Sequence, residues 1–145
     1  MPFAANRAPV EPGYFVLRPD GAPRLVGSYS PGADTCFFPR RRICPVTLGP
    51  VVDRELSTRG TLYSWTYLYE DRYGAITRGR GGYGIGQIDL PEGPRIQSRL
   101  LGAFGDWHIG MAMELALLDV MDGEQPARNT DGQYLVTFCF RAVAR

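Results

Sequence analysis

Three cysteines, Cys36, Cys44 and Cys139, and a single histidine, His108, are the residues best suited to nucleophilic chemistry. A catalytic thiol needs a base such as an imidazole within hydrogen-bond distance, and His108 is far from every cysteine along the chain. Cys139 lies in an apolar run, where cysteine usually acts as a small buried side chain. The chain has no lysine for Schiff-base chemistry, and its carboxylates show no acid and base pair. We therefore predict no catalytic residues.

Arginine forms two short basic clusters. A guanidinium fork suits phosphate, whether of a nucleic acid or of a small ligand, although a solvated surface is the usual role of such clusters. The second cluster, Arg78 and Arg80, overlaps a glycine-rich pattern, G-x-G-x-x-G, at residues 79–84. A dinucleotide site needs a helix after this pattern, whereas a strand-like run follows here, so we reject such a site. The clusters are Arg40, Arg41 and Arg42, and Arg78 and Arg80.

An aromatic stripe follows one predicted strand. Period-two geometry places its rings on one face of the strand, with Leu62 and Leu68 on the opposite face. Such rings could stack on bases, fill a barrel core or contact a protein partner. Because both faces of this strand carry large apolar side chains, we expect both to be covered, which favours a docked partner or a second packed layer. The predicted partner surface comprises Tyr63, Trp65, Tyr67, Tyr69 and Tyr83, with the loop from Glu70 to Gly82.

The composition restricts the class of protein. A chain of 145 residues with 44% apolar residues is long enough for one domain with a small appendage. A formal net charge of +1 argues against a general nucleic-acid binder. No apolar run reaches the roughly twenty residues that a membrane span needs. An odd number of cysteines and a start without a signal-peptide pattern predict reduced thiols and a cytoplasmic location.

The elements that must position these side chains are mostly strands. Residues 1–24, rich in Pro and Gly, predict an extended arm with one pairing of Tyr14–Leu17 against Arg24–Val26. We expect a short turn of helix within residues 102–110. Good helix formers fill residues 111–121, but the flanking glycines favour a strand. The predicted strands are Gly60 to Tyr69, Tyr83 to Leu90, Arg95 to Leu101, Met111 to Met121 and Gln133 to Val143, with a hairpin turn at residues 91–94. Five such strands match the Greek-key barrel of the OB-fold.

Two short runs carry a family resemblance. Phe38-Pro39-Arg40-Arg41 with Cys44-Pro45, followed by Gly60-Thr61-Leu62-Tyr63-Ser64, resembles the zinc-ribbon and OB-fold proteins that accompany thiolase-like enzymes. The resemblance covers about residues 25–141. It implies a rubredoxin-like ribbon over residues 25–58 and an OB-fold domain over residues 59–145. The whole chain is then mainly β, with the arm before the ribbon.

The resemblance also implies four zinc ligands, at Ser30, Ala33, Cys44 and Thr47, of which only one is a thiol. One cysteine cannot supply the tetrahedral set of a structural zinc site. We therefore predict a metal-free ribbon without cofactor, held by packing of Phe37, Phe38 and Ile43. Cys36 and Cys44, with Asp34, are the alternative ligands of a remnant site.

The function implied by the resemblance is that of a non-catalytic accessory subunit. Such a subunit would form a hetero-oligomer with a thiolase-like enzyme that makes or breaks a carbon–carbon bond beside an acyl-CoA thioester. The aromatic stripe would face the partner or its substrate channel, and the two arginine clusters would meet the CoA phosphates. Two alternatives remain at this point: a stand-alone OB-fold protein that binds single-stranded nucleic acid, and a small enzyme that uses Cys36 or Cys44.

Overall fold

The computed structural model describes residues 6–69 and 82–144, and no α-helix occurs in these two ranges. The prediction of a mainly β chain is confirmed. The predicted helical turn within residues 102–110 is wrong, because Gly102, Gly105 and Gly110 adopt positive φ angles that interrupt helical geometry. The strands are β1 (Arg7–Pro9), β2 (Phe15–Leu17), β3 (Pro23–Ser30), β4 (Thr35–Phe37), β5 (Val52–Glu55), β6 (Arg59–Leu68), β7 (Tyr83–Asp89), β8 (Arg95–Leu100), β9 (Ala112–Asp119), β10 (Met121–Asp122), β11 (Gln125–Pro126) and β12 (Tyr134–Ala142).

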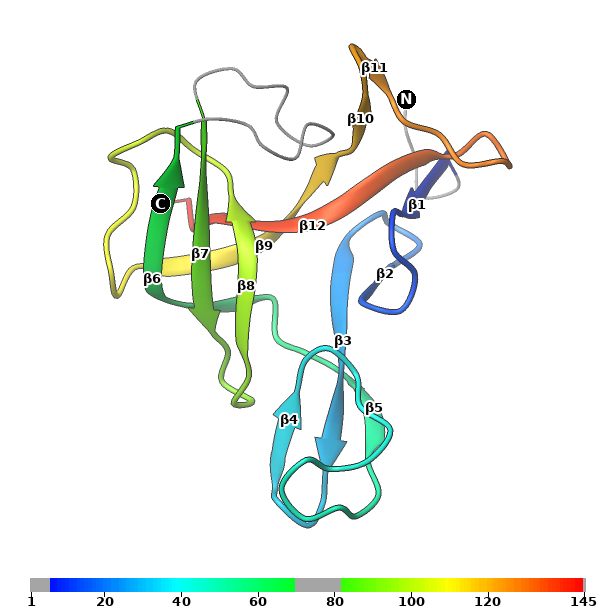
Figure 1. Cartoon of the computed structure of the whole chain (residues 1–145), viewed down its shortest axis with the longest axis vertical. Helices are drawn as coiled ribbons and strands as arrows, with labels where there is room; N and C mark the ends of the chain where they lie inside the picture. The colour runs from blue at the N-terminus through cyan, green and yellow to red at the C-terminus, as the bar shows by residue number, and fades with distance from the viewer. Residues whose placement is uncertain (1–5, 70–81, 145) are drawn as a thin grey trace.

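Strands β6, β7, β8, β12 and β9 close into a barrel (Figure 1). Neighbouring strands are antiparallel except β8 and β12, which run parallel and meet at Leu100 and Phe140. Closure by one parallel pair among five strands is the arrangement of the OB-fold. The five strands predicted from residue 60 onwards are therefore confirmed. The predicted hairpin turn is confirmed too, since Leu90 and Pro94 are joined by a backbone hydrogen bond of 3.0 Å.

A β-bulge in β6 changes the face on which its aromatic residues lie. The pairing with β7 shifts by one residue between Leu62 and Ser64, so Tyr63 is the extra residue. Leu62, Trp65 and Tyr67 consequently pack against the same core. Tyr63 stands outside the barrel and is 48% exposed. The predicted common face holds for Trp65 and Tyr67, but it is wrong for Tyr63 and Leu62, because the bulge reverses the alternation between them and the rest of β6.

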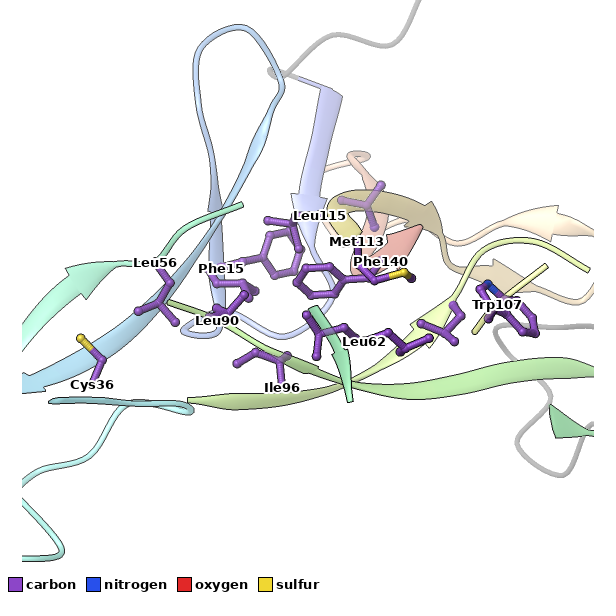
Figure 2. Close-up of a cluster of buried hydrophobic side chains, with 14 residues drawn as sticks. Phe15, Cys36, Leu56, Leu62, Leu90, Ile96, Trp107, Met113, Leu115 and Phe140 are labelled. Atoms are coloured by element: carbon purple, nitrogen blue, oxygen red, sulfur yellow. The ribbon is translucent and has the colours of Figure 1, made fainter. Parts of the chain in front are cut away.

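The hydrophobic core fills the barrel and continues beneath β2 and β3 (Figure 2). Glycines on β7 make room for its largest members. A Cβ added to Gly84 would lie 2.5 Å from the Trp107 ring, and one added to Gly86 would lie 2.9 Å from Leu100. The buried members are Phe15, Leu25, Cys36, Leu56, Leu62, Ile88, Leu90, Ile96, Leu100, Trp107, Met113, Leu115, Val136 and Phe140.

The N-terminal arm is attached to the rest of the chain at two places. β1 pairs in parallel with β12, and β2 pairs with the first half of β3. The second pairing places Phe15 opposite Leu25, which confirms the predicted hairpin. The last residues of β3 pair instead with β4 and β5. Residues 27–58, here called the lower unit, therefore contain a small antiparallel sheet drawn at the bottom of Figure 1.

The hairpin between β7 and β8 joins the barrel to the lower unit. The Glu92 carbonyl accepts hydrogen bonds from the Cys36 backbone N–H at 3.2 Å and from the Thr35 hydroxyl at 3.3 Å. The Glu92 carboxylate also accepts the Ser57 backbone N–H at 3.0 Å and the Ser57 hydroxyl. Gly93, at a φ of 115°, leaves no space for a side chain, since a Cβ there would lie 2.4 Å from Thr35 Oγ1. This turn of the barrel thus contacts two separate segments of the lower unit.

Candidate interaction surface

Five aromatic residues gather at the end of the barrel where β6 finishes. We call Trp65, Tyr67, Tyr69, Phe104 and Trp107 the ring cluster. The Tyr67 centroid lies 5.1 Å from Tyr69, 5.3 Å from Phe104 and 6.3 Å from Trp107. Trp65 lies 5.6 Å from Trp107 and 6.0 Å from Phe104. Edge-to-face and tilted contacts at these distances are the preferred geometry of aromatic pairs.

The loop between β8 and β9, residues 101–111, supplies the two rings that the sequence prediction missed. Trp107 enters the space above Gly84, and its indole N–H donates to the Leu101 carbonyl at 3.3 Å. The Asp106 carboxylate accepts the Ala103 backbone N–H at 2.7 Å. Gly110 N–H donates to the carbonyl of Leu62 on β6 at 2.8 Å, which fixes the far end of the loop. The glycines of this loop predict only a turn, and no sequence pattern places Phe104 and Trp107 beside the rings of β6.

The ring cluster has a buried base and an exposed rim. Trp107 is 4% exposed, whereas Tyr69 is 71% exposed and Phe104 is 58% exposed. Ile109, in the same loop, is 68% exposed. Rings that are held by packing lose little conformational freedom when they are covered, which is why aromatic residues are common in protein interfaces. This end of the barrel therefore suits protein contact.

Two other residues of the predicted partner surface lie outside the ring cluster. The Arg95 guanidinium covers the Tyr63 ring at 3.3 Å and forms two hydrogen bonds, of 2.6 and 3.2 Å, with the Asp89 carboxylate. Tyr83 is only 7% exposed, with the Arg99 guanidinium 4.5 Å from its ring centre. Cation–π contacts of this kind occupy one face of each ring.

The first arginine cluster belongs to the lower unit. Arg40 forms an ion pair with Asp53 at 2.8 Å and donates to the Gly13 carbonyl at 3.1 Å. Arg41 and Arg42 are exposed, and neither has an ion pair with any residue in 6–69 or 82–144. β6 rises away from the lower unit toward its end at Leu68, so the structure does not bring this cluster to the ring cluster (Figure 1).

Part of the predicted surface cannot be placed. Arg78 and Arg80, and the predicted loop up to residue 81, lie outside the described residues.

The three cysteines occupy three different environments. Burial raises the pKa of the Cys36 thiol and raises that of Cys139 to about 12. Burial also tends to raise the pKa of Cys44, but hydrogen bonds from Ser30, Thr47 and nearby backbone N–H groups outweigh it and lower the pKa to about 7. Cys44 is fully buried and His108 is exposed in the loop before β9. The geometry gives none of these thiols both a base and access to a substrate.

The residues present do not fit a zinc ion. Of the four positions that the resemblance implies as ligands, Cys44 alone is a thiol, and its sulfur already accepts the backbone N–H groups of Val46 and Thr47 at 3.4 and 3.3 Å. Cys36 lies elsewhere, in the core beside Leu56 (Figure 2). In the part of the chain that the structure describes, no three His, Cys, Asp or Glu side chains gather in a group that could hold a metal ion. A structural zinc site needs four such ligands.

Comparison of sequences relates this chain to known proteins. The benzoylsuccinyl-CoA thiolase subunit BbsA of Thauera aromatica is 33% identical over 123 residues, which is 84% of this chain and 78% of BbsA. Residues 53–118 match the family model described as ChsH2, C-terminal OB-fold domain. The chain belongs to the same family as BbsA. The resemblance found in the sequence, to accessory proteins of thiolase-like enzymes, is thereby confirmed.

A solved structure has the same fold as this chain. The structure, of the Ltp2-ChsH2(DUF35) aldolase, superposes with a TM-score of 0.63 at 23% sequence identity. The match covers 83% of this chain and 86% of that chain, so it includes more than the barrel. No helix in residues 6–69 or 82–144 is long and apolar enough to span a membrane.

Proposed function

We propose that the chain is a non-catalytic accessory subunit of a thiolase-like enzyme that acts on acyl-CoA or a related acyl thioester. The exposed rim of the ring cluster, Tyr69 and Phe104, is the observation that carries the proposal. The relationship to BbsA, named a thiolase subunit, supports the class of partner. In this proposal the bond between carbon atoms is made or broken in the partner, and the accessory chain completes the assembly and its substrate channel.

The exposed rings supply the attraction to the partner. Covering one large apolar side chain contributes about 1.5–3 kcal/mol, and a pair of rings that both pack on Tyr67 requires little ordering on binding. A protein surface with a shallow apolar pocket matches such a rim better than a phosphate backbone does. Tyr67, half-buried between the base and the rim, holds the two exposed rings in position.

The state of the cysteines supports a non-catalytic role. Cys36 and Cys139 are buried thiols with raised pKa values, and Cys44 is enclosed by its own hydrogen-bond donors. A thiolase-like reaction needs an accessible nucleophile, so the partner must supply it. The same observation counts against a small enzyme that uses Cys36 or Cys44.

We further propose that Arg41 and Arg42 meet the phosphates of CoA. Both are exposed, whereas Arg40 is engaged by Asp53. Guanidinium groups form bidentate, charge-assisted hydrogen bonds with phosphate. Because these residues belong to the lower unit, the acyl-CoA would extend along the molecule from this unit toward the barrel. A role for Arg78 and Arg80 remains a prediction.

The alternative of single-stranded nucleic-acid binding has less support. An OB-fold protein stacks bases on rings of its outer sheet surface, but here Arg95 and Arg99 already lie over Tyr63 and Tyr83. The net charge of +1 provides little attraction to a phosphate backbone.

Co-purification tests the proposal. The chain is co-expressed with a tagged thiolase-like protein from the same genome, and the complex is captured through the tag. We expect the wild-type chain to be retained and the Tyr69→Ala/Phe104→Ala variant to bind about 100-fold more weakly, because two interface rings are lost. Val46→Ala is the matched control, since Val46 is as exposed as Tyr69, at 71%, but lies in the lower unit.

Two results would contradict the proposal. One is failure of the wild-type chain to bind any thiolase-like protein of its genome, together with salt-sensitive binding to single-stranded oligonucleotides. The other is equal retention of the wild-type chain and the double variant.

A further inference from the structure

Two turns of the lower unit close around one buried sulfur atom. The first turn follows β3, where Asp34 N–H donates to the Ser30 carbonyl at 2.7 Å. The second turn starts at Cys44, whose carbonyl accepts Leu48 N–H at 2.8 Å. The turns face each other, since a Cβ added to Gly32 would lie 3.3 Å from Thr47 Oγ1. The Cys44 side chain, fully buried, lies between them.

Hydrogen-bond donors of both turns surround the Cys44 sulfur. Backbone N–H groups of Val46 and Thr47 donate to it at 3.4 and 3.3 Å, and the nearby hydroxyls of Ser30 and Thr47 lower its pKa. Each hydroxyl is itself held by a backbone N–H: Ser30 accepts from Ala33 at 3.2 Å and Thr47 from Gly49 at 3.1 Å. The backbone of each turn therefore orients the hydroxyl that faces the sulfur.

The family resemblance implies a zinc ion bound by the residues at positions 30, 33, 44 and 47. The residues present at these positions do not supply the ligands for it. We propose that hydrogen bonds to the Cys44 sulfur take the place of a metal ion in the lower unit, which therefore folds without zinc. Ser30 and Thr47 stand where two thiolate ligands would be, and their hydroxyls face the sulfur instead. Ala33, at the remaining position, contributes its backbone N–H to Ser30.

Two of the apolar residues expected to stabilise the lower unit by packing do not pack within it. Ile43, which the sequence predicted as a packing residue of this unit, is wrongly assigned, because it is 51% exposed. Phe38 packs against Tyr14 and Phe138, outside the lower unit. Neither side chain connects the two turns, whereas the Cys44 sulfur lies between them.

Metal analysis of the intact chain is the first test. After expression with added zinc and purification without chelators, we expect far less than one zinc per chain, and EDTA should leave the melting temperature unchanged. About one tightly held zinc per chain, or a fall in melting temperature with EDTA, would overturn the proposal.

Restoration of the ligands is the second test. The variant Ser30→Cys/Ala33→Cys/Thr47→Cys should bind one Co²⁺ with the intense absorption of a tetrahedral thiolate site, because the turns already face each other. Adding Cys44→Ser should weaken Co²⁺ binding by at least about tenfold, whereas adding Cys36→Ser should not change it. A folded triple variant that does not bind Co²⁺ would contradict the placement of these residues around one centre.

Single substitutions keep the proposal testable if the triple variant does not fold. Ser30→Ala and Thr47→Val each remove a hydroxyl donor to the sulfur, and each should lower the melting temperature by several degrees. Thr66→Val, at an exposed position of β6, is the matched control and should melt with the wild-type chain. Equal melting temperatures for all three variants would show that the sulfur network does not stabilise the unit.

Discussion

The barrel and the lower unit bury different kinds of side chain. The barrel's fully buried residues include Leu62, Ile88 and Phe140, which interdigitate across its closed sheet. In residues 27–58, by contrast, the side chains with no exposed surface are Ser28, Ser30 and Cys44, while Leu56 and Cys36 are buried against the core that the barrel shares. Packing of apolar groups tolerates small shifts, whereas hydrogen bonds to a hydroxyl or a sulfur require particular partners. The barrel should therefore respond to lost volume, and the lower unit to lost donors.

The largest effect should come from Phe140→Ala, which removes volume from the barrel. Phe140 is fully buried and pairs with Leu100 where β12 meets β8. We expect the free energy of unfolding in urea to fall by about 3–5 kcal/mol, because a ring-sized cavity is left in the core. Phe104→Ala, which truncates a ring that is 58% exposed, is the control and should cost less than about 1 kcal/mol. If Phe140→Ala and Phe104→Ala lowered the free energy of unfolding by similar amounts, the barrel would not depend on its buried volume in the way expected here.

An intermediate effect should follow from Glu92→Ala. This substitution removes hydrogen bonds between the barrel and the lower unit but leaves no cavity in the core of either. The variant loses the carboxylate that accepts the backbone N–H and hydroxyl of Ser57. We expect a loss of about 1–3 kcal/mol, because Ser57 then has donors without their partner. Amide hydrogen exchange should quicken in residues 27–58 and remain slow in the barrel. A double-mutant cycle with Ser57→Ala measures the coupling, and a coupling energy near zero would count against this junction.

The parts of the molecule that the sequence predicts are those with local signals. The hairpin at residues 91–94 has proline and glycine at the turn, and β9 is bounded by glycines, so both follow from neighbouring residues. The bulge at Tyr63 depends on pairing with β7, a strand distant in sequence. Trp107 joins the ring cluster only because Gly84 leaves space for its indole. The hydrogen bonds to Cys44 likewise need two turns that are separate in the chain. Long-range register and closure therefore account for what the sequence pattern missed.

The effect most specific to the lower unit, absent at pH 6 and growing only at higher pH, is a pH dependence of stability that arises from Cys44. Hydrogen bonds lower the pKa of this thiol to about 7 in the folded chain, against an ordinary value of 9.0. Below pH 7 the thiol is protonated in both states and adds nothing. As the pH rises toward 9, only the unfolded state keeps the proton, so the stability that Cys44 contributes increases with pH and is lost again on acidification through about pH 7.

Comparison with Cys44→Ser isolates this contribution, because the serine hydroxyl does not ionise in this range. Cys36 and Cys139, whose pKa values are raised by burial, ionise first in the unfolded chain and favour unfolding at high pH. Their effect is the same in both proteins and cancels in the difference. We expect the difference in free energy of unfolding, wild type minus variant, to grow between about pH 6 and pH 9. A difference that is constant over this range would mean that the sulfur is held as a neutral thiol, and the lower unit would then be stabilised by ordinary packing like the barrel.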